Sequence, residues 1–475
     1  MSKHVVFSSV TFLYLFLPVC LLGFFLLPGL KAKNYFLLFM SLFFYAWGEP
    51  KWILLMLIST AVEYVGAILV DKYRGTGKAK AALIVSISVA LSFLFVFKYL
   101  DFFTFNFNTL THADIPILGL TLPIGISFYT FQTITYIVDV YRDKAPVQKN
   151  FGFLLLYVSM FPQLIAGPIV KYADIEAQIK DRRLTGRGAG EGVLRFLTGL
   201  FKKAVLANVA GEVASGFLDG SLASLTTAGA WIGILAYTFQ IYFDFSAYSD
   251  MAIGLGRIFG FTYRENFNYP YIANSINDFW KRWHISLTTF FREYLYIPLG
   301  GNRKHQVLNL LIVWFLTGFW HGAAWNFIAW GLYYFVLIVC EKLFLGKALE
   351  KAPAFVGHVY TLLFVVLGWG LFYFDDMSRL RTFFTVLFGF GEAGAASAGD
   401  WSVVLNHIVF FLFAIIAVLP VSRMLKERYI RFGRKSEQNA KLADAGLIVF
   451  SVVLLFLDTA AVVGSTYNPF LYFRF

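Results

Sequence analysis

Long apolar runs separated by short polar loops make up most of this chain. A run of about 20 mostly apolar residues is long enough to cross a bilayer as a helix. By that measure the pattern predicts an all-α, polytopic membrane protein with about eleven membrane-spanning helices, within a range of roughly ten to thirteen. The candidate spans lie at roughly 10–30, 35–50, 51–70, 81–100, 120–140, 150–170, 195–218, 228–260, 307–340, 356–374, 382–391, 403–421 and 443–464.

Two of the apolar runs are too long for one straight span. The run from Trp231 to Phe261 is interrupted by Asp244 and Asp250. The other run, 307–340, has no acidic or basic residue to interrupt it except a single histidine. We expect both runs to form helices that are kinked or paired at their polar residues.

The longest stretch without a candidate span is 264–303, which is rich in aromatic and basic residues. Such a composition suits helices in the membrane interface, with Trp and Tyr at headgroup depth and Arg and Lys reaching water. We therefore predict one membrane domain over 1–475, with 264–303 as an interfacial segment within it. The sequence has no internal repeat, so it does not support the inverted-repeat plan of many transporters.

Composition and charge agree with a membrane protein. The chain is 59% hydrophobic and 14% charged, whereas a soluble domain has about 25% charged residues. The net charge of +12 is carried largely by loops such as 72–80 and 423–441, which the positive-inside rule places in the cytoplasm. No base-stacking aromatic pattern accompanies these charges, so we expect anionic lipid rather than nucleic acid as their partner.

His321 is the ionisable residue inside the run 307–340, in the stretch "GFWHGAAWNFIAWG". Intramembrane ionisable groups are functional candidates by default, and a buried neutral imidazole can serve as a general base. If the helix is continuous, Thr317 and Trp325 lie one turn either side of His321 on the same face. Gly318 and Gly322 leave room for a backbone break or a ligand. A structural histidine bonded to a helix backbone is the alternative.

His284 is the second candidate, in "NDFWKRWHISLTTFF". At helical spacing it shares a face with Trp280, Leu287 and Phe291. The alternative is a histidine at the edge of an interfacial amphipathic helix. The sequence has no HExxH motif, no cysteine pair and no carboxylate three or four residues from either histidine, so we expect no metal site.

Four blocks of the sequence resemble the membrane-bound O-acyltransferase superfamily. They are "FPQLIAGPIVKY" (161–172), "QIYFDFSAYSDMAIGLGRIFGF" (240–261), "FWKRWHISLTTFFREYLYIPLGGNR" (279–303) and the stretch around His321. The ending "YNPFLYFRF" (467–475) resembles the bacterial branch that O-acetylates alginate. The resemblance implies a multi-helix enzyme with a central funnel or tunnel that moves an acyl group from a thioester to a hydroxyl or an exported partner. It implies that His321 is the catalytic residue and His284 the second histidine of the family.

On this basis we expect an acyltransferase in the bacterial plasma (inner) membrane that serves O-acetylation of an extracytoplasmic polysaccharide such as alginate. The expected donor is acetyl-CoA or another acyl thioester, with no tightly bound cofactor, and the expected partner is an extracytoplasmic SGNH-type acetyltransferase. Acetylation of peptidoglycan or cellulose, or D-alanylation of teichoic acid from a carrier protein, keeps the same fold. Two alternatives come from other functional classes. One is a transporter or channel that carries out no chemistry, and the other is a docking scaffold.

The blocks also suggest how substrates are bound. His321 is interpreted as a general base or a transient acyl carrier, and His284 as the group that orients the acceptor or polarises the carbonyl. Arg282 and Arg292, with Lys281, are candidates for binding a coenzyme A phosphate or an acidic carrier, with lipid anchoring as the alternative. The expected substrate-contacting residues are Trp280, Trp283, Trp320, Trp325, Thr317, Gln163 and Asp244.

Asp244 and Asp250 each need a partner inside the membrane. We expect an ion pair for each, for instance with Arg257 or Lys171, and a role in a substrate channel is the alternative.

Overall fold

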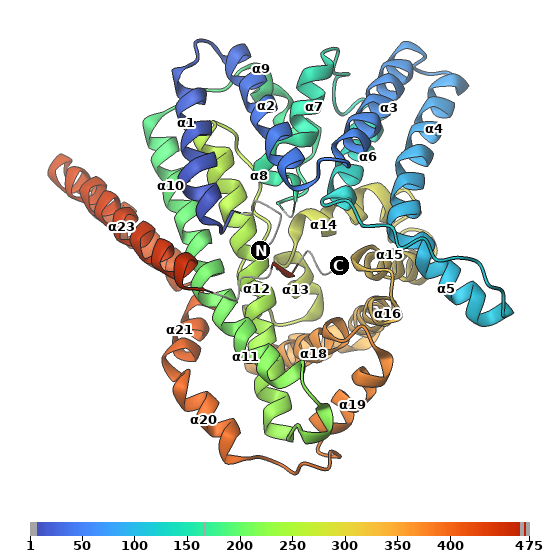
Figure 1. Cartoon of the computed structure of the whole chain (residues 1–475), viewed down its shortest axis with the longest axis vertical. Coiled ribbons are helices and arrows are strands. Elements are labelled where there is room, and N and C mark those ends of the chain that lie inside the picture. The colour runs from blue at the N-terminus through green and yellow to red at the C-terminus, as the bar shows by residue number, and fades with distance from the viewer. Residues whose placement is uncertain (1–6, 166, 466–469, 472–475) are drawn as a thin grey trace. The chain divides into compact units, whose positions relative to one another are not determined.

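A computed structural model describes residues 7–165, 167–465 and 470–471, and within these ranges it is helical with no strand (Figure 1). The chain divides into two compact units. Unit 1 comprises Met1–Phe196, Met251–Arg264 and Arg292–Leu295, and unit 2 comprises Leu197–Asp250, Glu265–Phe291 and Tyr296–Phe475. Of the C-terminal stretch 467–475, only Phe470 and Leu471 lie within the described residues.

The helices of unit 1 come mostly from the first part of the chain. They are α1 (Leu17–Leu26), α2 (Leu30–Gly48), α3 (Ile53–Lys72), α4 (Gly77–Leu94), α5 (Leu100–Thr111), α6 (Ile126–Tyr141), α7 (Phe151–Ser159), α8 (Phe161–Leu164) and α9 (Tyr172–Lys180), with the π-helical turns η1 (Phe12–Phe16) and η2 (Phe95–Tyr99). Helices α10 (Gly186–Phe201) and α12 (Thr227–Ile258) contribute residues to both units.

Helix α6 forms the core of unit 1. Every residue from Ile126 to Val140 is buried, and α3, α4, α7 and α9 pack around it. Two of its threonines are satisfied within the helix, because the Thr133 and Thr135 hydroxyls donate to the carbonyls of Thr130 and Gln132 at 3.0 and 2.8 Å. A helix buried on all sides therefore carries hydroxyls without exposing them to lipid.

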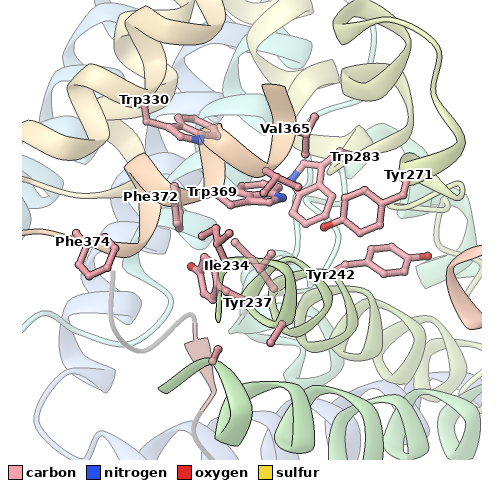
Figure 2. Packing of buried hydrophobic residues seen from close by; sticks show 14 of the residues in the cluster. Ile234, Tyr237, Tyr242, Tyr271, Trp283, Trp330, Val365, Trp369, Phe372 and Phe374 are labelled. Atoms are coloured by element: carbon pink, nitrogen blue, oxygen red, sulfur yellow. The ribbon is translucent and has the colours of Figure 1, made fainter. Parts of the chain in front are cut away.

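Unit 2 holds the remaining helices, and its core is an aromatic cluster built mainly from α12, α13, α16 and α18 (Figure 2). Its helices are α11 (Asn208–Leu218), α13 (Ile276–Arg282), α14 (Ile285–Phe290), α15 (Gln306–His321), α16 (Trp325–Cys340), α17 (Gly346–Lys351), α18 (Ala354–Tyr373), α19 (Met377–Leu387), α20 (Ala398–Asn406), α21 (Ile408–Val418), α22 (Val421–Gly433) and α23 (Glu437–Gly464). The shorter turns are η3 (Lys202–Ala207), η4 (Leu222–Ser224), η5 (Pro270–Ile272), η6 (Phe291–Tyr296) and η7 (Glu341–Leu345).

Several helices are long and apolar enough to cross a membrane. Among the described residues there are 5 of them, or 6 if α20 and α21, bent by 63°, form one broken span. The expected number of about eleven is therefore not confirmed. Some of the apolar runs that we counted as spans form shorter helices, such as Phe12–Leu26 and Gln306–His321.

The two overlong apolar runs behave differently. The run 307–340 breaks as expected, since α15 ends at His321, Gly322 is extended and α16 begins at Trp325. The expectation of a break in the other run is wrong, because α12 is one helix of 32 residues. Its two aspartates form ion pairs with lysines of η3, so the helix accommodates them without interruption.

Close packing of α15 against α16 occupies the space that we expected a ligand to use at Gly318. A Cβ atom on Gly318 would lie 2.2 Å from the carbonyl oxygen of Phe327, and one on Gly331 would lie 2.3 Å from that of Trp314. The two helix backbones therefore touch where both residues lack a side chain. Such close approach is the usual reason for small residues at helix interfaces in membranes.

The segment 264–303 forms several short helices instead of one. Its Trp280 and Trp283 are 5% and 3% exposed and belong to the core of unit 2. Helix α13 ends at Arg282, and His284 has φ 43°, a left-handed conformation that separates α13 from α14. The predicted helical face shared by Trp280 and His284 is therefore wrong.

We predict that Gly331→Ala lowers the thermal stability of the purified protein. The added methyl group forces α15 and α16 apart, at a cost of about 1–3 kcal/mol. Thermal unfolding in detergent, followed by tryptophan fluorescence, measures the effect. Gly216→Ala is the matched control, since a Cβ on this glycine of α11 meets no atom within 4 Å. Equal melting temperatures for the two variants would contradict the prediction.

Candidate active site

An apolar cavity in unit 2 has His321 in its wall. The cavity is small, because the centre of a water-sized sphere can occupy only about 40 Å³ of it. Its lining residues are Ile241, Asp244, Phe245, Trp283, His321, Trp330, Trp369, Phe372, Phe470 and Leu471. Three of the predicted site residues, His321, Asp244 and Trp283, therefore meet at one cavity.

The end of α15 determines where the His321 ring lies. His321 is the last residue of the helix, and the extended Gly322 turns the chain away. The ring stands nearly perpendicular to three aromatic rings, with centroid distances of 4.9 Å to Trp320, 5.0 Å to Trp330 and 5.2 Å to Phe372. It is partly exposed rather than buried, so this imidazole borders a largely apolar space.

The wall next to His321 contains aromatic rings from α16, from α18 and from Trp283, the residue after α13. Figure 2 shows four of these side chains, Trp283, Trp330, Trp369 and Phe372. The Trp283 and Trp369 rings lie 4.8 Å apart, and Trp369 and Phe372 lie 5.9 Å apart. The Trp369 and Phe372 rings meet edge to face, and the Trp283 and Trp369 rings are tilted by 47°. Such contacts favour one arrangement of large rings. The cavity shape is therefore set by stiff side chains.

His284 lies behind this wall, only 1% exposed. Its ring packs edge to face against Phe245 at 4.7 Å, and Phe245 lines the cavity. It also lies 6.2 Å from the ring of Trp320, the neighbour of His321. Burial lowers the pKa of His284, which lies outside the membrane-spanning candidates, to about 3. The imidazole is therefore neutral at physiological pH.

Asp244 forms a buried ion pair at the cavity. Its carboxylate lies 2.6 Å from the Lys203 ammonium, and the two side chains are 2% and 3% exposed. The Leu471 backbone N–H donates to the other carboxylate oxygen at 2.8 Å, which ties the C-terminal stretch to α12. Pairing of Asp244 and Asp250 was expected, but the suggested partners were wrong. Asp250 pairs with Lys202 at 2.6 Å.

The suggested partners have other ion pairs. Arg257 lies 2.5 Å from Glu191, and Lys171 lies 2.6 Å from Glu293. Both pairs lie within unit 1.

Three further predicted residues of unit 2 are close to the site without lining the cavity. Trp320 contacts both histidine rings. Trp280 packs among Trp314, Trp330 and Tyr334 in the aromatic cluster. The Thr317 hydroxyl donates to the carbonyl of Val313 at 2.7 Å, so it serves its own helix.

The structure does not bring the remaining predicted residues to the cavity. Trp325 starts a new helix and is 54% exposed, so the face that it was expected to share with His321 does not exist. Arg282 pairs with Asp278 at 3.0 Å. Gln163 and Arg292 belong to unit 1, where Gln163 donates to the Tyr157 carbonyl at 2.7 Å and Arg292 lies 3.4 Å from Glu293.

Sequence reasoning missed most of the cavity wall. Trp330 lies in the same stretch as His321, but the helix break changes which residues face one another. Phe470 and Leu471 belong to the C-terminal stretch whose resemblance was noted. Trp369, Phe372 and Lys203 carry no motif that marks them. No group of three metal-binding side chains gathers anywhere in the described ranges.

The fold and cavity define a helical membrane protein with an ionisable ring beside an apolar space. A model of the membrane-bound O-acyltransferase family matches residues 39–380, and the chain belongs to this family. It is therefore a membrane acyltransferase, as the four sequence blocks predicted.

Named relatives cover much of the chain. It is 35% identical to the "probable alginate O-acetylase" of Azotobacter vinelandii, over 99% of this chain and 100% of that protein. It is 38% identical to the "peptidoglycan O-acetyltransferase" of Helicobacter pylori, over 77% and 76% of the two chains. A "teichoic acid D-alanyltransferase" of Bacillus subtilis is 28% identical over 52% of this chain and 68% of its own.

We predict that Asp244→Leu strongly destabilises the protein, because it leaves the buried Lys203 ammonium without its carboxylate. Breaking a buried ion pair in this way costs about 3–5 kcal/mol. The double variant Lys203→Met/Asp244→Leu should recover most of that loss, since it removes both charges. Thermal unfolding of the two single variants and the double variant tests this. If the losses of the single variants simply add in the double variant, the pair is not coupled.

Proposed function

We propose that this acyltransferase moves an acetyl group from a cytoplasmic thioester, acetyl-CoA or a similar donor, for O-acetylation of an extracytoplasmic polysaccharide such as alginate. The observation that carries the proposal is the partly exposed His321 ring in the wall of an otherwise largely apolar cavity. The name of the Azotobacter vinelandii relative, similar over its whole length, supports acetyl as the group and alginate as the polymer.

His321 acts as the general base in this proposal. A hydroxyl is a poor nucleophile until a base takes its proton during attack. His321 accepts the proton of the acceptor hydroxyl. The hydroxyl oxygen then bonds to the carbonyl carbon of the thioester, and the C–S bond breaks. The ester forms, and the proton passes to the departing thiolate. The aromatic wall limits water at the site, which protects the thioester from hydrolysis.

Charge and chemistry support the proposed donor and the proposed partner. The basic residues at 72–80 lie around the turn between α3 and α4, and those at 423–441 lie mostly on α22 and α23. By the positive-inside rule they favour a cytoplasmic location, the side on which anionic acetyl-CoA or an acyl carrier would bind. An exported polymer lies on the other side of the bacterial inner membrane. An SGNH-type acetyltransferase outside the membrane is the proposed partner that completes the transfer. No tightly bound cofactor is required by this chemistry.

Peptidoglycan is the second candidate acceptor. The Helicobacter pylori relative that carries this activity in its name is 38% identical, comparable with the alginate relative. Measuring acetyl esters on both polymers in one strain separates the two acceptors. D-Alanylation has weaker support, because the relative with that name is 28% identical and covers 52% of this chain.

We predict that His321→Gln lowers polymer acetylation by about 10²–10⁴-fold, the usual contribution of a general base. The assay measures acetyl esters on the exported polymer in cells whose own copy of the gene is deleted, with equal amounts of each variant in the membrane. His407→Gln is the matched control, since His407 is also partly exposed but lies outside the cavity. Normal acetylation by His321→Gln would overturn the proposed role of this residue.

A further inference from the structure

Asn266, in the loop between α12 and α13, holds the side chain of His284 through a network within unit 2. The Ser286 backbone N–H lies 3.1 Å from Asn266 Oδ1, and the Ser286 hydroxyl lies 2.8 Å from the same atom. A backbone N–H only donates, so this atom of Asn266 is the carbonyl oxygen. The Asn266 amide nitrogen donates to the Ser249 hydroxyl at 3.1 Å, which agrees with that orientation.

The same oxygen determines which nitrogen of His284 carries the proton. His284 Nδ1 lies 3.2 Å from Asn266 Oδ1. Because a carbonyl oxygen has no hydrogen, Nδ1 must be the donor. A neutral imidazole has one N–H, so Nε2 carries a free lone pair. The Ser286 hydroxyl, 3.4 Å from Nδ1, already donates its hydrogen to Asn266, so it acts there as a second acceptor.

The lone pair on Nε2 is buried and unused. Within residues 7–165, 167–465 and 470–471, His284 Nε2 has no hydrogen-bond partner. The ring lies against Phe245, which lines the cavity, and against Trp320, which precedes His321. Buried acceptors are almost always paired, so this nitrogen beside the cavity is available to a donor group of a bound ligand.

Asn266 also holds the backbone on which this ring is mounted. The N–H of Ile285 donates to the Asn266 carbonyl at 2.9 Å. His284 itself has φ 43° and ψ 54°, a left-handed conformation that costs energy for a residue other than glycine. The side chain and the main chain of Asn266 therefore fix both the direction and the tautomer of the His284 imidazole.

We propose that Asn266 is a positioning residue that keeps His284 in the Nδ1–H tautomer, so that Nε2 accepts a hydrogen bond from an O–H or N–H group of the bound substrate. The proposal rests on the proposed function for the identity of that substrate. It assigns His284 the role of orienting a substrate donor group. A bare Nε2 has no hydrogen to give, so His284 does not polarise the thioester carbonyl in this state.

The tautomer is tested directly in the wild-type protein. Solid-state ¹⁵N NMR of histidine-labelled protein in bilayers distinguishes a protonated from a bare imidazole nitrogen, and subtraction of a His284→Gln spectrum assigns the signals. We expect a protonated Nδ1 and a bare Nε2. A protonated Nε2 would overturn the proposal. This measurement does not depend on activity, so its failure is distinct from normal acetylation by His321→Gln, which would overturn the proposed function.

Variants of Asn266 separate positioning from simple packing. Asn266→Asp keeps acceptor oxygens toward Nδ1–H, so we expect it to retain the tautomer and acetylation within about tenfold of wild type. Asn266→Leu removes the acceptor and should lower acetylation per folded molecule by about 10- to 100-fold, as loss of a histidine's orienting partner does elsewhere. Equal acetylation by both variants would contradict the proposal, and the Asp variant and the spectrum remain informative if the Leu variant does not fold.

Asn309→Leu provides the matched control. Asn309 is also a buried asparagine of unit 2, but its side-chain amide donates to the carbonyls of Gly301 and Lys304. Polymer acetylation by the Asn309→Leu variant should change only with the amount of folded protein. Initial rates at varied donor and acceptor concentrations then identify the ligand group. A raised KM for the thioester in Asn266→Leu indicates an N–H of the donor, and a raised KM for the acceptor indicates a hydroxyl.

Discussion

A carbonyl of α16 approaches α15 at a point where residue 318 has no side chain, and a carbonyl of α15 approaches Gly331 in return. This reciprocal contact holds the two helices backbone to backbone on either side of the break at Gly322. Because the break directly follows His321, the contact places an imidazole at a helix end instead of mid-helix. The rings of Trp330 and Phe372 then surround it, and the cavity forms beside them.

The polar groups around this cavity are handled in two ways. Lys203 and Asp244 neutralise one another, so that a charged pair is tolerated inside an apolar core. His284 stays neutral and has one nitrogen bound to Asn266. The His321 ring lies in the cavity wall, and Nε2 of His284 has no hydrogen-bond partner among the described residues. In the proposed reaction, the small number of polar groups at the cavity helps to keep water from the thioester.

Much of the protein was predictable where the physical cause is local. The class of protein follows from run lengths and charge, and the break after His321 follows from a run too long for one helix. The errors came where partners lie far apart in the chain. Asp244 was expected to bend its helix, but Lys203 neutralises it, and Trp325 was placed on the face of a helix that ends before reaching it.

The sequence by itself determined the helical membrane class and the family, and it predicted His321 as the catalytic residue. Hydropathy and motif spacing are properties of consecutive residues, so they do not depend on how the helices pack. Only the tertiary structure decided which rings enclose His321 and which nitrogen of His284 is free. Those features depend on atoms from α12, α13, α15, α16 and α18 coming within hydrogen-bonding or van der Waals distance. Packing sets those distances, and no pattern along the chain records them.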